Sequence, residues 1–189
     1  MARPQRAKTP APTLTPHEHL NMMVIRRSRH QPEPGDLFAL NMRGERWVIG
    51  RVINNNAVGL APGANLLYFY RMEVKDPLDP TAITTPITPD LLIPPTITND
   101  RGWTTGFYLH LRNAPLQPQE LLPRHVFKSV LFPEDDPRSF VDEYQKQTPP
   151  PEPGLIIGRA GLASYSIIDV YLSRALGIPE PKDPGGPWP

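Results

Sequence analysis

Proline restricts the fold of this chain more than any other feature, because it makes up 27 of the 189 residues. Each proline fixes φ and removes a backbone hydrogen-bond donor, so long uninterrupted helices are disfavoured. Long central strands are restricted as well, since proline belongs at strand edges and in turns. Apolar residues, at 39%, suffice for a modest core. The composition therefore predicts one domain with flexible ends, built from short strands, many loops and one good helix.

The charges nearly cancel, with 20 Lys and Arg against 19 Asp and Glu. This balance argues against bulk electrostatic attraction to nucleic acid or to an anionic membrane. The charge is unevenly distributed, however, because residues 1–30 are basic and residues 134–143 are acidic. We interpret both runs as solvated charge, and contact of the basic run with the acidic run or with a partner is the alternative.

The absence of cysteine excludes disulfide scaffolds, thiol catalysis and cysteine-based zinc sites. The basic, proline-rich N-terminus has no apolar run of the kind found in a secretory signal. No stretch approaches the roughly 18 apolar residues of a membrane span. We therefore expect a soluble cytoplasmic protein that does not associate with membranes.

Several segments have the apolar pattern of strands. The first two follow the turn signal Pro34-Gly35-Asp36 and form a hairpin, in which Gly50 suggests a bend or bulge. A later segment alternates apolar and mixed residues from Trp103 to Leu111, the period of a half-buried strand. The predicted strands cover residues 37–40, 47–53, 66–70, 103–111 and 126–132. The proline-rich residues 75–100 between them predict an irregular segment pinned across the core.

One convincing helix is predicted near the C-terminus, where the apolar side chains form a single stripe. Ser166 and Asp169 have the spacing of a capping box, and Gly177 supplies the stop. The stripe consists of Ile167, Ile168, Tyr171, Leu172, Ala175 and Leu176.

These elements predict a mainly β (α+β) fold: a small, strongly bent antiparallel sheet or partial barrel with the C-terminal helix packed on it. The predicted divisions are a largely flexible basic arm (1–30), a single β-rich domain (31–178) and a flexible Pro/Gly tail (179–189).

No arrangement of residues predicts catalysis. No Gly-x-Ser-x-Gly elbow accompanies the histidines, and we interpret His110 as an ordinary half-exposed histidine. Residues 134–136 are adjacent carboxylates, which diverge around the backbone rather than converge on a substrate. His17-Glu18-His19 offers metal ligands without a third ligand at useful spacing. Residues 154–161 lack phosphate-loop spacing. We therefore predict no enzyme activity, no metal and no cofactor, with a hydrolase of unrecognised site as a remaining alternative.

Binding functions remain. Tyr68, Phe69, Tyr70 and Arg71 could form an aromatic and basic platform on which single strands stack, but the surrounding chain lacks a basic field. A small nucleic-acid-binding β-barrel is therefore the alternative, and nucleic acid is not the expected partner. Recognition of another protein is the function that the sequence favours.

The order of motifs resembles the immunity protein 26 family of bacterial polymorphic toxin systems. The residues that carry the resemblance, over roughly residues 32–175, are Gly35-Asp36 with Phe38-Ala39, Gly50-Arg51-Val52, the aromatic residues 66–70, Gly102-Trp103, Ala114-Pro115-Leu116, Leu122-Pro123 and Phe127. The proline-rich residues 76–97 and the basic arm depart from it. The resemblance implies a mainly β protein that neutralises a toxin encoded beside it by direct binding, and it brings no catalytic residues.

An immunity protein needs a preformed surface, and complementary charge raises its association rate. If the toxin is a basic nuclease domain, the acidic run is the natural contact, and residues at predicted loop or strand ends are secondary contacts. The predicted toxin-binding residues are Glu134, Asp135, Asp136, Asp142, Glu143, Arg46, Asp100 and Arg101.

Overall fold

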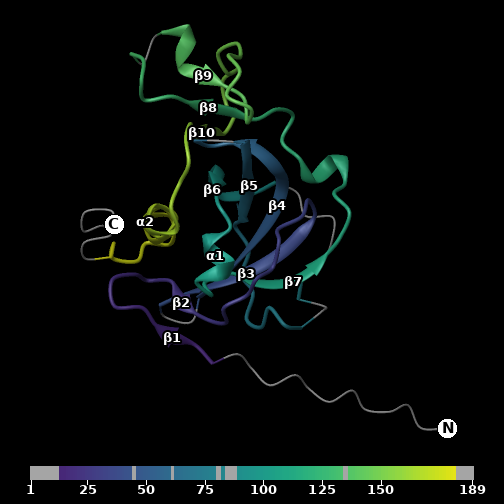
Figure 1. Ribbon diagram of the computed structural model, residues 1–189, viewed down its shortest axis with the longest axis vertical. Coiled ribbons are helices and arrows are strands. Elements are labelled where there is room, and N and C mark those ends of the chain that lie inside the picture. Colours follow the sequence, from purple (N-terminus) through teal and green to yellow (C-terminus); the bar gives the residue numbers. More distant parts are fainter. Residues whose placement is uncertain are drawn as a thin grey trace, which may run out of the picture.

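A five-stranded antiparallel sheet forms the body of the molecule (Figure 1), which confirms the mainly β prediction. The computed structural model describes residues 13–43, 46–60, 62–79, 82–83, 89–133 and 136–181. The sheet order is β6-β5-β4-β3-β7, and β6 and β7 are its edges, so these strands do not close into a barrel. The strands are β3 (Asp36–Met42), β4 (Arg46–Val58), β5 (Pro62–Tyr70), β6 (Leu91–Thr98) and β7 (Leu109–Asn113).

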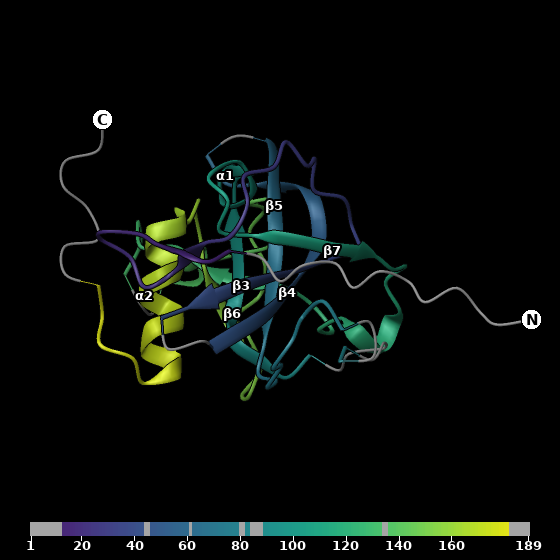
Figure 2. The same cartoon turned by 90° about the horizontal axis from the view of Figure 1, so that it is seen from below.

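The sheet is covered on both faces, and this explains why every residue of β3 and the last seven residues of β5 are buried. Successive side chains of β3 alternate between the two apolar clusters: Phe38 and Leu40 join one, Leu37 and Ala39 the other. The first cluster includes side chains of the helices α1 (Arg101–Thr104) and α2 (Tyr165–Leu176). Figures 1 and 2 show α2 beside the curled sheet.

A second, three-stranded sheet lies at one end of the body (Figure 1). We call residues 125–160, which contain it, the small lobe. Its strands are β8 (Val126–Lys128), β9 (Phe140–Val141) and β10 (Ile157–Arg159), in the order β10-β8-β9. The 3₁₀ turn η1 (Pro118–Glu120) comes before β8 in the chain, and the 3₁₀ turn η2 (Pro137–Ser139) lies between β8 and β9. At Gly158 an added Cβ would lie 2.5 Å from the Pro95 carbonyl oxygen, so β10 lies directly against the edge strand β6.

Part of the N-terminal segment packs into the core. Leu20, Met22 and Ile25 are buried, next to the short paired strands β1 (Thr15–Pro16) and β2 (Met23–Val24). Residues 1–12 of the predicted arm and 182–189 of the predicted tail lie outside the described residues. The division into arm, domain and tail stays a prediction.

The strand predicted over residues 103–111 is confirmed only at residues 109–111 and is wrong for residues 103–108. The segment begins as helix α1, turns at residues 105–108, and only then forms β7. Gly106 has φ +94°, and an added Cβ on Gly102 would lie 2.2 Å from the Tyr108 ring. The Trp103 and Tyr108 rings pack edge to face with their centroids 5.0 Å apart. The alternating apolar residues therefore build an aromatic cluster, and this packing overrides the period of two.

Two further strand predictions need correction. The region expected to be irregular contains β6, and Pro94 and Pro95 are tolerated there because β6 is an edge strand. Gly50 marks no bulge in the β3–β4 pairing; it lies opposite Phe38, whose ring an added Cβ would approach to 2.2 Å.

Helix α2 confirms the C-terminal prediction, and Gly177 ends it with φ +65°. Its N-cap, however, is Ser164, whose hydroxyl accepts the Ile167 N–H, rather than Ser166. Asp169 does not cap the helix, because its buried carboxylate accepts the Met22 N–H at 2.7 Å. No helix in the described ranges is both long and apolar enough to cross a membrane.

Candidate docking site on the small lobe

Three of the predicted toxin-binding residues, Asp136, Asp142 and Glu143, lie in the small lobe, between β8 and the loop after β9. Glu134 and Asp135 lie outside the described residues. The structure thus places the described part of the acidic run on one lobe.

Two of these carboxylates organise the local backbone. The Asp136 carboxylate accepts a hydrogen bond from the Arg138 guanidinium at 2.6 Å and from the Arg138 N–H at 2.8 Å. These bonds and the guanidinium charge lower the pKa of Asp136. The Asp142 carboxylate accepts the N–H groups of Tyr144 and Lys146, both at 2.9 Å. Their charge is therefore fixed in place by the lobe's own turns.

Glu143 belongs to a polar network that ties the lobe to the body. Its carboxylate lies 3.3 Å from His125 Nδ1, and His125 Nε2 lies 2.6 Å from the Tyr68 hydroxyl of β5. Burial alone raises the pKa of Glu143, but the hydrogen bond from His125 holds it below its ordinary value. Burial raises the pKa of Tyr68 to about 12. The buried Tyr68 hydroxyl also accepts the Leu122 N–H at 3.1 Å, so it connects β5 to the chain that leads into the lobe.

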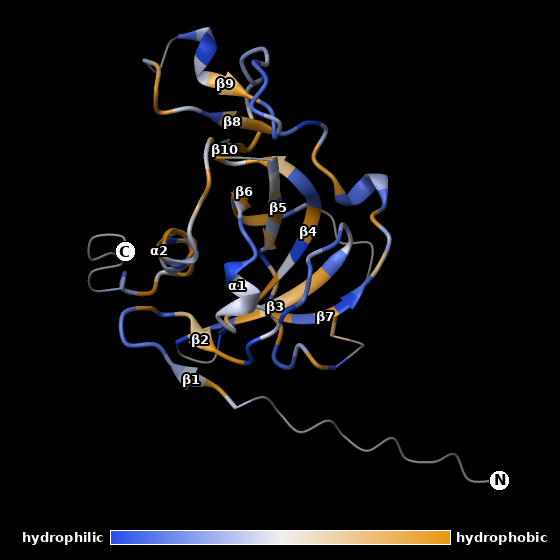
Figure 3. Ribbon diagram, viewed as in Figure 1, coloured by the Kyte–Doolittle hydropathy of each residue, from blue (hydrophilic) through white to orange (hydrophobic). Residues whose placement is uncertain are grey.

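The loop after β8 exposes large apolar side chains. We call Val130, Leu131 and Phe132 the apolar tip; their exposed fractions are 67%, 84% and 36%. Figure 3 shows this loop as an orange run at the outer edge of the lobe. The sequence predicted a strand over residues 126–132, which would include the apolar tip, but β8 ends at Lys128. Clustered exposed apolar side chains are typical of interaction surfaces.

A groove of about 800 Å³ adjoins the apolar tip. Its walls come from the tip, β10, the edge strand β6 and helix α2, and most of its lining is apolar. Leu60, which is 88% exposed, lies at the same groove. Lys128 and Arg159, neighbours in the β8–β10 pairing, supply cationic groups. Among the described residues that line the groove, none is a histidine or a carboxylate.

The secondary candidates lie away from the groove. Arg46, at the start of β4, donates to the Leu176 carbonyl at 2.6 Å and so satisfies the C-terminal end of α2. Asp100 and Arg101 are exposed at the start of α1, which lies toward the opposite end of the molecule from the small lobe (Figure 1).

The aromatic platform expected of the nucleic-acid alternative does not form. Tyr68 and Phe69 are completely buried and Tyr70 is 2% exposed, so these rings are not accessible to bases. Arg71 is exposed but lies 3.6 Å from the Asp90 carboxylate.

The geometry thus defines a mainly β protein with an apolar groove and an exposed apolar tip. A sequence model of the family described as Immunity protein 26 matches residues 33–135, more than half of the chain, so the chain belongs to this family. The matched region contains the five-stranded sheet and the apolar tip, whereas β10 and α2, which form the other groove walls, lie beyond it. No curated protein and no solved structure matches the chain.

Proposed function

We propose that this protein is a cytoplasmic immunity protein that binds a cognate bacterial toxin and neutralises it by occlusion, without catalysis. Membership of the immunity protein 26 family supports the general role. The docking face proposed here is the apolar tip together with the adjoining groove.

This proposal rests on one observation: large exposed apolar side chains gather at the tip and the groove. Of the large apolar side chains exposed in the described part of the chain, Leu60, Val130 and Phe132 line the groove, and Leu131 lies between two of them in the tip. Protein interfaces combine such an apolar centre with a polar rim, and a few central anchors carry most of the binding free energy. The body needs no such exposure for its own stability, because its strands are already covered on both faces.

The toxin surface that fits this face has an apolar segment that enters the groove, acidic or hydrogen-bond-accepting groups opposite Lys128 and Arg159, and basic side chains opposite the acidic run. The acidic run begins two residues after Phe132 in the sequence, and the carboxylates of Asp136, Asp142 and Glu143 are held in the same lobe. Negative charge there raises the association rate with a basic partner such as a nuclease domain, while the apolar contact sets the lifetime of the complex. Arg46, Asp100 and Arg101 lie outside this docking face, and their role as secondary contacts stays a prediction.

Co-expression with the toxin domain encoded in the adjacent gene tests the function directly. The wild-type chain should restore growth and bind the purified domain. A Val130→Asp, Leu131→Asp double variant should lose protection, with the Kd rising by at least about 30-fold, as expected for loss of a central anchor. Leu78→Asp is the matched control, since Leu78 is also an exposed apolar residue but does not line the groove.

Two outcomes would contradict different parts of the proposal. Failure of the wild-type chain to bind or protect would overturn the immunity function with this toxin. Full protection by the folded double variant, with an unchanged Kd, would overturn the docking face alone.

A further inference from the structure

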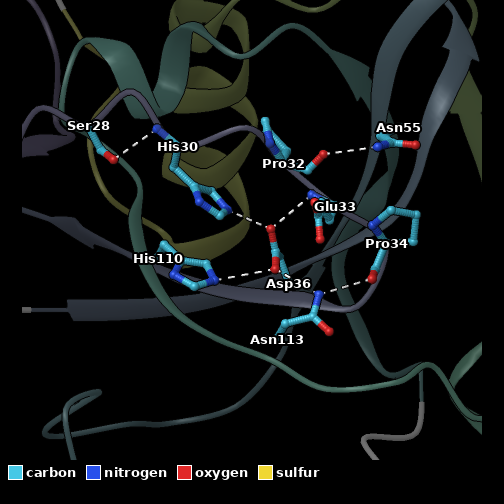
Figure 4. A network of polar contacts seen from close by, with 9 residues as sticks. All are labelled: Ser28, His30, Pro32, Glu33, Pro34, Asp36, Asn55, His110 and Asn113. Carbon is cyan, nitrogen blue, oxygen red and sulfur yellow. Dashed lines mark hydrogen bonds and ion pairs between the residues drawn. The ribbon is translucent and has the colours of Figure 1, made fainter.

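A polar cluster that takes no part in the groove lies at the β3–β7 edge of the sheet (Figure 4). Asp36, the first residue of β3, lies between two imidazoles. Its Oδ2 is 2.6 Å from His30 Nε2, and its Oδ1 is 3.3 Å from His110 Nε2. The possible ligand atoms of the three residues all lie within 4.8 Å of one another.

The carboxylate is fixed before any ligand arrives. Asp36 is 2% exposed, and it also accepts the Glu33 N–H at 2.9 Å and the Asn113 Nδ2 at 2.8 Å. Gly35 lets the chain pass close to the neighbouring strand end, because an added Cβ would lie 2.3 Å from the Ala114 carbonyl oxygen. Each carboxylate oxygen therefore has one fixed donor besides its imidazole.

The two imidazoles come from separate segments and are both partly open to solvent. His110 is in β7, opposite Phe38 of β3. His30 is held from the N-terminal side, where its N–H donates to the Ser28 hydroxyl and the Ser28 N–H donates to the Trp103 carbonyl. The rings stack with their centroids 4.0 Å apart, and the side chains of His30 and His110 are 23% and 32% exposed.

We infer that His30, Asp36 and His110 bind a divalent transition-metal ion, with Zn²⁺ as the best fit. Zinc bonds to histidine nitrogen and carboxylate oxygen at about 2.0–2.2 Å, which places tetrahedral ligand atoms about 3.4 Å apart. The His110 Nε2–Oδ1 separation of 3.3 Å already matches this spacing, whereas the His30 Nε2–Oδ2 separation of 2.6 Å has to widen when the ion enters. Each neutral imidazole carries its proton on Nδ1 when Nε2 binds the ion.

The ligand set selects the class of ion. Two imidazoles with one carboxylate suit zinc and its transition-metal neighbours, whereas Mg²⁺ and Ca²⁺ prefer oxygen ligands. The Glu33 N–H and Asn113 donors remain to orient the carboxylate, as outer-shell groups do in zinc sites. Because both imidazole side chains are partly exposed, water can supply the fourth ligand. The ion would join the N-terminal segment to the β3–β7 edge, independently of toxin binding.

Metal titration of the full chain without an affinity tag tests the inference. Zn²⁺ affinity is measured by competition with a chromophoric chelator, and Co²⁺ substitution should give the visible absorption of a tetrahedral site. The chain has no cysteine, so thiolate binding cannot contribute to either signal. In imidazole ¹⁵N spectra of the wild type, one equivalent of Zn²⁺ should shift His30 and His110 among the five histidines.

Variants with matched controls separate this site from surface binding. His110→Gln should abolish stoichiometric binding, and Asn113→Ala should weaken it by about 10- to 100-fold through the outer shell. The His17→Gln, His19→Gln double variant is the control, because His19 and Glu18 form the exposed metal-ligand alternative. Absence of stoichiometric binding to the wild type, or shifts confined to His17 and His19, would overturn the inference. The wild-type spectra decide it even if a variant does not fold.

Discussion

The five-stranded body and the small lobe are stabilised in different ways. In the body, every residue of β3 is buried and apolar side chains fill both faces of the sheet. In the lobe the strands are two or three residues long, and turns closed by Asp136 and Asp142 hold the chain between them. The loop that carries the apolar tip is therefore shaped mainly by local polar contacts. The sheet that supports it is shaped by burial.

The two regions meet through apolar packing as well as through specific contacts, because Phe127 of β8 is completely buried in the second apolar cluster and Val141 and Ile156 pack against that cluster. The Tyr68–His125–Glu143 network joins β5 to the lobe, and Gly158 allows β10 to approach the edge of β6. Since most of the buried apolar side chains belong to the body, changes there should cost global stability, whereas changes at the exposed parts of the junction or the lobe should act more locally.

The largest effect is expected in the body for Glu120→Ala. The Arg51 guanidinium and the Glu120 carboxylate form an ion pair in which both side chains are completely buried. Removing the carboxylate leaves a buried charge without its ionic partner and should cost about 3–5 kcal/mol of unfolding free energy. Urea unfolding measures this loss. An Arg51→Met, Glu120→Leu double variant removes both charges and should recover most of the lost unfolding free energy. A double variant as unstable as Glu120→Ala would contradict this explanation.

A smaller and more local effect is expected at the junction for Gly158→Ala. The added Cβ would lie 2.5 Å from both the Phe127 ring and the Pro95 carbonyl oxygen. Relieving this overlap should cost about 1–3 kcal/mol. Hydrogen exchange should accelerate in β8 and β10 but change little in β3–β5. Equal acceleration in the body would show that the two regions unfold together.

The polar network predicts a pH effect of about 1 kcal/mol, the usual net contribution of one hydrogen bond. The folded-state pKa of Glu143 lies below its ordinary value of 4.5. The stability it contributes is therefore present above pH 4.5 and is lost as the pH falls through the folded-state pKa. Glu143→Gln should destabilise the protein at pH 7, and its difference from the wild type should shrink on acidification. Urea unfolding at pH 7, 5 and 3.5 measures this, and a difference that grows at low pH would contradict it.

The smallest effect on stability is expected at the tip. Leu131→Ala should change the unfolding free energy by less than about 0.5 kcal/mol, because Leu131 is 84% exposed. The same substitution at the completely buried Leu67 of β5 should cost about 2–5 kcal/mol. Thermal or urea unfolding of the pair compares the regions directly. A large loss for Leu131→Ala would mean that the tip packs against the protein in solution.

The sequence by itself determined the elements whose signal is local. The apolar runs at residues 37–40, 47–53 and 66–70 became β3, β4 and β5, and the stripe before Gly177 became α2. Apolar periodicity and a left-handed glycine act within one element, so they are visible without knowledge of its neighbours.

Only the tertiary structure decided which segments lie at an edge, which apolar side chains stay exposed, and which distant side chains meet. The aromatic packing of Trp103 and Tyr108 turned a strand-like pattern into α1. Burial is a property of neighbours, so the sequence could not distinguish the exposed tip from the continuation of strand β8. His110 is 74 positions from Asp36 in the chain, and only the pairing of β3 with β7 brings them together.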